Sequence, residues 1–253
     1  MVIYYIVCFF ILGTIFGSFY NVVGTRMPEG ESIMFPPSHC NNCKHRLTPL
    51  ELIPIFSYLL QGGKCKKCKI KLSIKYLIYE VMTGVLFSLS YLLFGFSLEL
   101  ILALTFVSIL TIVIISDIDY FIIEDKVLIV GAILIFIELT FIYDINVALM
   151  HLLSGLISFI IMLLLKKFGD FIFKKESMGG GDIKLLGFIG LVIGVPMSII
   201  TIFASSFIAL PISLVILFKQ KTDIIPYGPF LSLAAIMIFF TKLDFYMFLD
   251  LLR

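Results

Sequence analysis

Long runs of apolar residues follow one another along almost the whole chain, separated by short polar stretches. A helix needs roughly 18 or more such residues to cross a hydrocarbon core of about 30 Å. Eight runs approach or exceed that length, at residues 2–23, 77–96, 98–116, 127–143, 147–165, 183–199, 201–218 and 230–249. The pattern predicts an all-α polytopic membrane protein with about eight transmembrane helices.

Two of these assignments leave an alternative open. The division between the sixth and the seventh rests on Gly194, Val195 and Pro196, because proline cannot continue a helical hydrogen-bond ladder at its own nitrogen. The first run has the position of a signal peptide, but it lacks a basic start, and no small-residue cleavage pattern precedes Asn21 and Arg26. We therefore expect it to be retained as a helix.

Composition supports a membrane protein, since 60% of the residues are hydrophobic, 14% are charged and the mean hydropathy is +1.13. These values exclude an ordinary soluble globule. The net charge of +2 gives no reason to expect a nucleic-acid partner.

The basic residues lie almost entirely in one set of loops. If eight helices alternate, the segments 26–75, 117–126, 166–184 and 219–221 share one side of the membrane and hold 17 of the 19 lysines and arginines. Short loops rich in these residues stay in the cytoplasm. The asymmetry predicts a multi-pass protein of the cytoplasmic membrane with both termini outside.

The one sizeable polar segment predicts a small domain. The expected organisation is a first helix at residues 1–25, a cytoplasmic loop domain at 26–76, and a helical core at 77–253. The loop holds four of the five cysteines as two Cys-x-x-Cys pairs with 21 residues between them: Cys40, Cys43, Cys65 and Cys68. Four thiolates at about 2.3 Å suit Zn²⁺, and a closed four-cysteine shell indicates a structural ion.

Other roles for these cysteines are open at this point. A pair of redox disulfides, as in a membrane thiol-disulfide oxidoreductase, is the alternative, although a reducing cytoplasm disfavours it. His39 and His45 flank the first pair and could replace a cysteine as ligand. Cys8, alone in the first apolar run, is expected to be a small buried hydrophobe.

Two aspartates lie where apolar helices meet polar sequence. The third predicted span leads directly into Asp117 and Asp119, and the sixth starts after Gly179, Gly180 and Gly181 with Asp182. Ionisable groups at a membrane boundary are functional candidates by default. Both helix ends are on the predicted cytoplasmic side, so Asp117 and Asp182 can meet.

Two neighbouring carboxyl groups suit the hydrolysis of an amide. They cannot both ionise easily, so the pair holds a shared proton. The ionised member takes a proton from water while the protonated member donates to the scissile carbonyl oxygen. Because the pair titrates as a unit, neither Asp117 nor Asp182 is assigned as the acid.

The glycines before Asp182 remove side chains from a stretch where an extended substrate strand could approach. The alternative is a flexible loop with Asp182 as a helix N-cap. Asp117 could likewise be an interfacial carboxylate without a catalytic role. Asp119, Glu124 and Asp125 are expected to be solvated or to attract a basic substrate.

Taken in order, these motifs resemble the type IV prepilin peptidases, bacterial enzymes that process pilins, pseudopilins and competence pseudopilins. The resemblance covers nearly the whole chain and rests on Gly17–Val23, Arg26-Met27-Pro28, the two cysteine pairs, Ser73–Tyr76 with Glu80 and Thr83-Gly84, Asp117-Ile118-Asp119, and Gly179–Asp182 as the GxGD signature. One departure is Glu124 before Asp125, where the family commonly has proline. It puts in doubt only the local turn and the substrate preference near it.

The resemblance implies a protease of the aspartyl type with Asp117 and Asp182 as its catalytic residues. It implies prepilin or pseudopilin substrates, embedded in the bilayer, whose basic leader is cut on the cytoplasmic side after a glycine, in pilus assembly, protein secretion or competence. It also implies N-methylation of the new terminus from S-adenosylmethionine, with the loop Arg26 to Lys75 and Glu80 as contributors. The sequence itself shows no glycine-rich signature for that methyl donor.

Other classes fit less well. A small transporter would place its acids near the bilayer midplane, and another peptidase of the presenilin-like group would lack the cysteine pairs. Within the helices, His151 is expected to be hydrogen-bonded near the outer interface. Glu138, inside the fourth predicted span, is expected to snorkel, and the sequence suggests no stronger role for it.

Overall fold

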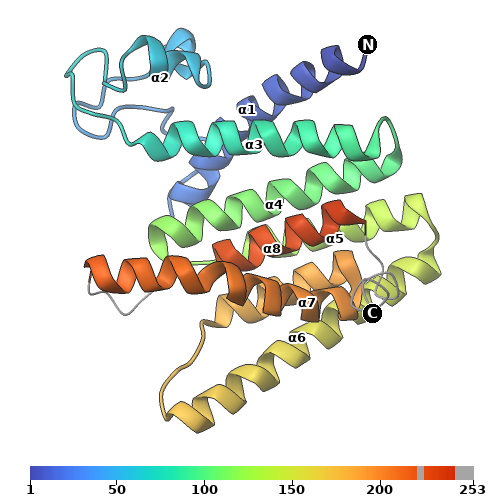
Figure 1. Ribbon diagram of the computed structural model, residues 1–253. Coiled ribbons are helices and arrows are strands. Elements are labelled where there is room, and N and C mark those ends of the chain that lie inside the picture. The colour runs from blue at the N-terminus through green and yellow to red at the C-terminus, as the bar shows by residue number, and fades with distance from the viewer. Residues whose placement is uncertain (221–224, 243–253) are drawn as a thin grey trace. The chain divides into compact units, whose positions relative to one another are not determined.

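The computed structural model describes residues 1–220 and 225–242, without the side chains of 216–220. The described chain is helical, in the order α1 (Val2–Arg26), η1 (Pro49–Leu52), α2 (Phe56–Leu60), α3 (Ile74–Phe94), α4 (Leu98–Tyr120), α5 (Asp125–Ile142), α6 (Ile145–Phe173), α7 (Gly180–Gln220) and α8 (Gly228–Thr241) (Figure 1). Among the described residues, α1, α3, α4, α6 and α7 up to Val215 are long and apolar enough to cross a membrane. The prediction of an all-α membrane protein is confirmed.

The sixth and seventh predicted spans form one continuous element, α7, with a break where it was expected. Gly194 has φ 78° and ψ 167°, outside the helical region, and Pro196 follows it inside the helix. Glycine tolerates this backbone conformation, and proline removes a hydrogen bond from the ladder. The kink therefore divides α7 into the two predicted segments.

Several helices end at different residues from those predicted. α6 continues to Phe173, through Lys166 and Lys167, and stops only where Lys174 adopts a left-handed backbone with φ 53°. Hydropathy marks the end of the apolar run, whereas lysine is itself a good helix former. α8 ends at Thr241, and the rest of the predicted span 230–249 lies largely outside the described residues.

The chain divides into two compact units, Met1–Leu100 and Ile101–Arg253. In the first, α1 packs along α3 and the polar loop connects them (Figure 1). A Cβ on Gly13 would lie 2.7 Å from the Thr83 carbonyl oxygen and 2.8 Å from the Cα of Gly84. Small residues spaced four apart allow this close approach of membrane helices, so Gly13 and Gly17 set the contact.

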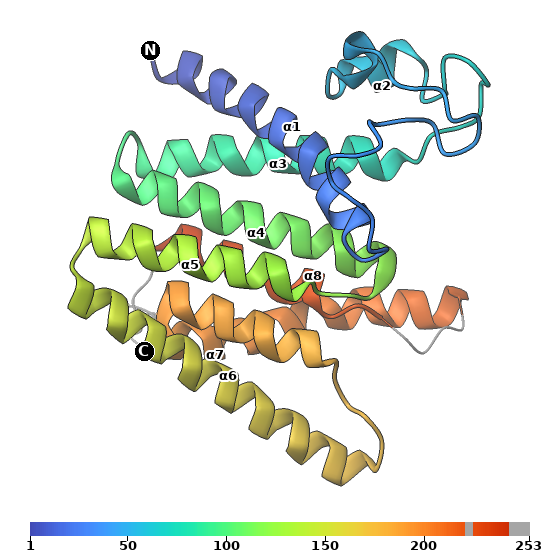
Figure 2. The same ribbon diagram turned by 180° about the vertical axis from the view of Figure 1, so that it is seen from behind.

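The second unit is built around α4. Its side chains Phe106, Leu110 and Ile115 are fully or almost fully buried. The Phe106 ring packs against Phe188 of α7 at 5.8 Å and against Phe239 of α8 at 5.2 Å between ring centroids. Further out, α6 packs against α7 and α5 (Figure 2). α4 thus carries its last turn into the interior of the helical unit.

Candidate active site and cysteine cluster

Asp117 lies in the last turn of α4 and is 6% exposed. Its Oδ2 accepts a hydrogen bond of 3.0 Å from the backbone N–H of Gly228. Gly228 is the first residue of α8, so its N–H is one of the amides that a helix leaves unpaired at its N-terminus. The positive end of the α8 dipole therefore faces this carboxyl group.

Only glycine fits at position 228. A Cβ built there would lie 2.6 Å from the Asp117 Oδ2, closer than such atoms approach in proteins. The sequence reasoning missed this partner. Its signal is the segment Pro226-Tyr227-Gly228-Pro229 before the last apolar run, because proline in the first turn is typical of a helix start.

Asp182 lies in the first turn of α7 and is 8% exposed. Its side chain accepts a hydrogen bond from the backbone N–H of Gly179, and it interacts electrostatically with Asp117. The bond from Gly179 resembles the helix-capping geometry that was the alternative for this residue. A capping role alone would not require the electrostatic interaction with Asp117.

Ile123 connects the two aspartate positions. A Cβ on Gly181, the residue before Asp182, would lie 2.9 Å from the Ile123 Cβ, and one on Gly228 would lie 3.1 Å from the Ile123 Cδ1. The glycine next to one aspartate and the glycine bonded to the other therefore pack against the same buried side chain. The ends of α4, α7 and α8 meet at this point.

The other acidic candidates are more exposed than this pair. Asp125 at the start of α5 forms an ion pair with Lys184 of α7, with both carboxylate oxygens 2.7 Å from Nζ. Both side chains are about half exposed. Asp119 is partly exposed and also contacts another group of the protein.

Gly180, in the glycine segment before Asp182, differs from Gly181, because a Cβ at position 180 would meet nothing within 4 Å.

The four loop cysteines converge, as their spacing predicts. Their Sγ atoms all lie within 4.8 Å of one another, with 3.8 Å between Cys40 and Cys68 and 3.9 Å between Cys43 and Cys65. All four are free thiols in the described structure, so the two disulfides that the redox alternative requires are not formed there. This cluster could hold a metal ion.

Two matching turns build the cluster. The Lys44 N–H donates to the Cys40 carbonyl at 2.8 Å, and the Lys69 N–H donates to the Cys65 carbonyl at 3.0 Å. Lys44 and Lys69 both have positive φ, 53° and 59°. Each Cys-x-x-Cys pair therefore curls its two thiols toward the same centre.

Backbone amides point at the sulfur atoms. The Ile70 N–H lowers the pKa of Cys68 to about 6, and the Cys43 N–H lowers the pKa of Cys40. The His45 N–H acts in the same direction on Cys43, but burial and the three other thiols raise its pKa to about 11. The cluster thus stabilises some thiolates, and a cation would stabilise all four.

The two histidines are occupied elsewhere. His45 Nε2 lies 3.3 Å from the Glu51 Oε2, and His39 Nδ1 lies 3.0 Å from the Pro37 carbonyl oxygen. The buried Glu51 also accepts from the Thr48 N–H and hydroxyl, and the Thr48 N–H is the main cause of its lowered pKa. Within the described residues, the metal-binding group consists of the four cysteines.

Three ionisable side chains inside the helices have hydrogen-bond partners in the structure. The Thr105 hydroxyl of α4 donates to the Glu138 Oε1 of α5 at 2.6 Å, so a neighbouring helix satisfies one of the two carboxyl oxygens. His151 Nδ1 lies 2.9 Å from the Leu191 carbonyl oxygen, as the expected hydrogen bond requires. Glu80 is 9% exposed, and its Oε2 accepts from the Ile55 N–H at 2.7 Å.

Two protein-family models match the chain. One is described as the Bacterial Peptidase A24 N-terminal domain and matches residues 11–94. The other is described as the Type IV leader peptidase family and matches residues 104–214. The first match contains the four cysteines, and the second contains Asp117 and Asp182.

Curated relatives share the same description, "Prepilin leader peptidase/N-methyltransferase". The protein from Bacillus subtilis (strain 168) is 42% identical over 195 residues, covering 74% of this chain and 73% of the relative. The Myxococcus xanthus protein is 33% identical over 181 residues, which are 72% of this chain and 54% of the relative. The Neisseria gonorrhoeae protein is 30% identical over 258 residues, with 90% and 88% covered. No solved structure matches the chain.

Proposed function

Because the chain belongs to the type IV leader peptidase family, we propose that it is a membrane aspartyl endopeptidase that removes the basic leader of type IV prepilins or pseudopilins. The observation that supports the mechanism is that Asp117 and Asp182 interact electrostatically where the end of α4 and the start of α7 pack around Ile123. Both carboxyl groups are buried and interact electrostatically. We assign them as the catalytic pair.

The geometry suggests how the two carboxyl groups divide the work. Asp117 receives an N–H from the start of α8 and Asp182 receives one from Gly179, so each has a donor that favours a charged oxygen. Their mutual repulsion favours one shared proton. The ionised group then activates a water, the protonated group donates to the scissile carbonyl, and no covalent intermediate forms.

The substrate is expected to approach along Gly179, Gly180 and Gly181. Gly180 is exposed and has open space where a Cβ would lie, whereas Gly181 packs against Ile123. An unwound substrate segment could therefore lie against Gly180 without meeting a side chain. Asp119 follows Asp117 by two residues, and Asp125 pairs with Lys184, two residues after Asp182; both would attract a basic leader.

We propose Zn²⁺ as the ion of the cysteine cluster. Cys40, Cys43, Cys65 and Cys68 supply four sulfur ligands, the donor set of a closed tetrahedral site. Such an ion leaves no open coordination position, so its role is to fix the fold of the loop. The basic loops, including this one, are proposed to face the bacterial cytoplasm.

The names of the relatives also include an N-methyltransferase activity. We propose that this chain retains it, with S-adenosylmethionine as the methyl donor. The described residues contain no strand-turn-helix site of the kind that holds a nucleotide-like cofactor, so no residue is assigned to the donor. A single-methyl mass increase on the processed pilin would reveal the activity.

Substitution of each aspartate by asparagine tests the peptidase. Asp117→Asn and Asp182→Asn are nearly isosteric but cannot share the proton, and each should lower the cleavage of co-expressed prepilins roughly 10²–10⁴-fold. Asp144→Asn is the matched control. Asp144 is the exposed N-cap of α6, just after the C-terminal end of α5, and asparagine caps a helix equally well. Normal processing by a membrane-inserted Asp117→Asn or Asp182→Asn variant would remove that residue from the mechanism.

A further inference from the structure

A group of large apolar side chains is exposed in the polar loop, outside every membrane-spanning helix. They belong to η1, α2 and the segment between them, and we call them the apolar face of the loop: Leu50 (75% exposed), Ile53 (42%), Phe56 (65%), Leu59 (60%) and Leu60 (87%). Exposed apolar residues on α1 and α3 face lipid along a span. Those on this face need a separate partner.

Lysines follow the apolar face along the chain. Residues 64–75 contain six, all exposed: Lys64, Lys66, Lys67, Lys69, Lys71 and Lys75. No acidic residue occurs between Leu52 and Tyr79. The partner of this region is therefore expected to be anionic.

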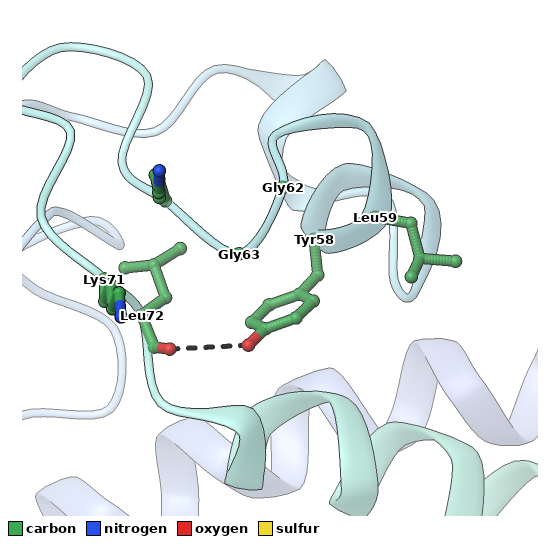
Figure 3. Close-up of a pocket in the computed structure, with 7 residues that line it drawn as sticks. Tyr58, Leu59, Gly62, Gly63, Lys71 and Leu72 are labelled. Carbon is green, nitrogen blue, oxygen red and sulfur yellow. Dashed lines mark hydrogen bonds between the residues drawn. The ribbon is translucent and has the colours of Figure 1, made fainter.

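A shallow pocket lies between α2 and the lysine-bearing segment. Leu59 of the apolar face lines it together with Lys64 and Lys71 (Figure 3). The Tyr58 hydroxyl donates to the Leu72 carbonyl at 3.4 Å across this pocket, which holds α2 against the lysine-bearing segment. In Figure 3 the Leu59 side chain points away from Lys71, so α2 has apolar side chains on one side and lysines of the neighbouring segment on the other.

The loop is fixed at the level where α3 enters its span. Ile55, the residue before α2, donates its N–H to the buried Glu80. Glu80 lies six residues after Ile74, about 9 Å along the helix axis from the start of α3. In both views α2 lies alongside the first turns of α3 (Figures 1 and 2). The residue between η1 and α2 that carries this bond is therefore held beside the first turns of α3, where the predicted span begins.

We propose that the apolar face of the loop inserts into the boundary between lipid headgroups and acyl chains, with the lysines of residues 64–75 on anionic headgroups. Amphipathic elements with apolar and basic sides bind membranes in this way. Charge disfavours two other partners. A second copy of the chain would bring another six lysines to the same surface, and the basic leader of the proposed substrate would also be repelled by them. The inference rests on α1 and α3 spanning the membrane and is independent of cleavage.

A single tryptophan can test this contact, because the chain contains none. Leu60→Trp places it on the apolar face, and Asn41→Trp places it on an exposed part of the same loop. Both variants are reconstituted in vesicles of phosphatidylglycerol and phosphatidylcholine with brominated acyl chains, which quench nearby tryptophan. Quenching at position 60 should be several-fold stronger than at position 41.

Equal, weak quenching at both positions would overturn the proposal. So would blue-shifted but unquenched emission at position 60, because a protein surface would then cover the face. In the Leu60→Trp background, Lys64→Gln with Lys71→Gln should lower the quenching, as should replacing phosphatidylglycerol by phosphatidylcholine. Quenching unaffected by either change would exclude anionic lipid as the partner. No substrate is present, so the result does not depend on peptidase activity.

Discussion

The cysteine cluster and the aspartate pair differ in what holds them in place. The cysteines lie in a loop whose two turns are closed by backbone hydrogen bonds, with exposed residues on both sides. The aspartates lie where three helices of a packed unit end, and they are buried against apolar side chains such as Ile123. A loop of this kind has little core of its own, so its order depends on a bound ion, whereas the aspartate site depends on packing. Removal of the ion should therefore affect the loop, whereas an added methyl group should affect the aspartate site.

Removal of zinc should give the largest effect, and it should be confined to the loop. Structural zinc contributes about 10 kcal/mol or more to the folding of small peptide sites. We expect a strong chelator, or Cys40→Ser, to make residues 26–74 sensitive to proteases while the helical circular dichroism stays nearly unchanged. Limited proteolysis with metal analysis measures this.

Cys8→Ser is the matched control for the metal, since Cys8 lies in α1 away from the cluster. It should leave both the zinc content and the protease resistance unchanged. A loop that resists proteases equally well without metal would show that the two turns are sufficient by themselves, and the contrast between the two regions would then fail.

Gly228→Ala should act on the aspartate site and spare the loop. The added Cβ would come within 2.6 Å of the Asp117 Oδ2, so Asp117 or the start of α8 must shift. A displacement of about 1 Å in an active site can lower the rate roughly 10²-fold. We expect a loss of this size in prepilin cleavage, measured on membranes with equal amounts of enzyme.

Gly180→Ala is a control for folding only, because it adds the same methyl group where there is open space, at the position proposed for the substrate strand. Its effect on folding should be negligible, and a fall in cleavage would indicate contact with the substrate strand. Full activity of Gly228→Ala would contradict the assigned place of Asp117. Unchanged zinc content in both variants would sharpen the separation of the two regions.

The features predicted from the sequence are those set by local spacing. Apolar runs longer than a bilayer thickness leave few alternatives to a helix, and two Cys-x-x-Cys pairs specify a cluster whatever the loop does between them. The break in α7 followed from Gly194 and Pro196 in the same way. Their information lies within a few neighbouring residues.

The features that were missed depend on partners far apart in the chain. Gly228 binds Asp117 across 111 residues, and Thr105 satisfies Glu138 across 33. The prolines around Gly228 mark a helix start, but nothing in the local sequence indicates which distant residue either group will bind. The extension of α6 was missed for another reason, since hydropathy reports where a membrane ends and gives no sign of where a helix ends.

Thr105→Val should have a moderate effect on the stability of the helical unit. It removes the hydroxyl that donates to Glu138, whose other oxygen has no hydrogen-bond partner in the structure. Loss of a donor to a buried polar group costs about 1–3 kcal/mol. A lower thermal unfolding midpoint in detergent is expected, and Thr105→Ser, which keeps the hydroxyl, should restore most of it. Equal midpoints for the valine and serine variants would mean that the bond contributes nothing.

Asp125→Asn should have the smallest effect on stability. The Asp125–Lys184 ion pair joins α5 to α7 close to the aspartate site, but both side chains are about half exposed. Exposed pairs contribute about 0.2–1 kcal/mol, and salt screens them. The unfolding midpoint should therefore hardly change. A clear loss of prepilin cleavage with an unchanged midpoint would identify Asp125 as a contact for the basic leader. Lys184→Gln distinguishes the two roles, because it breaks the same pair but leaves the acidic side chain free for substrate.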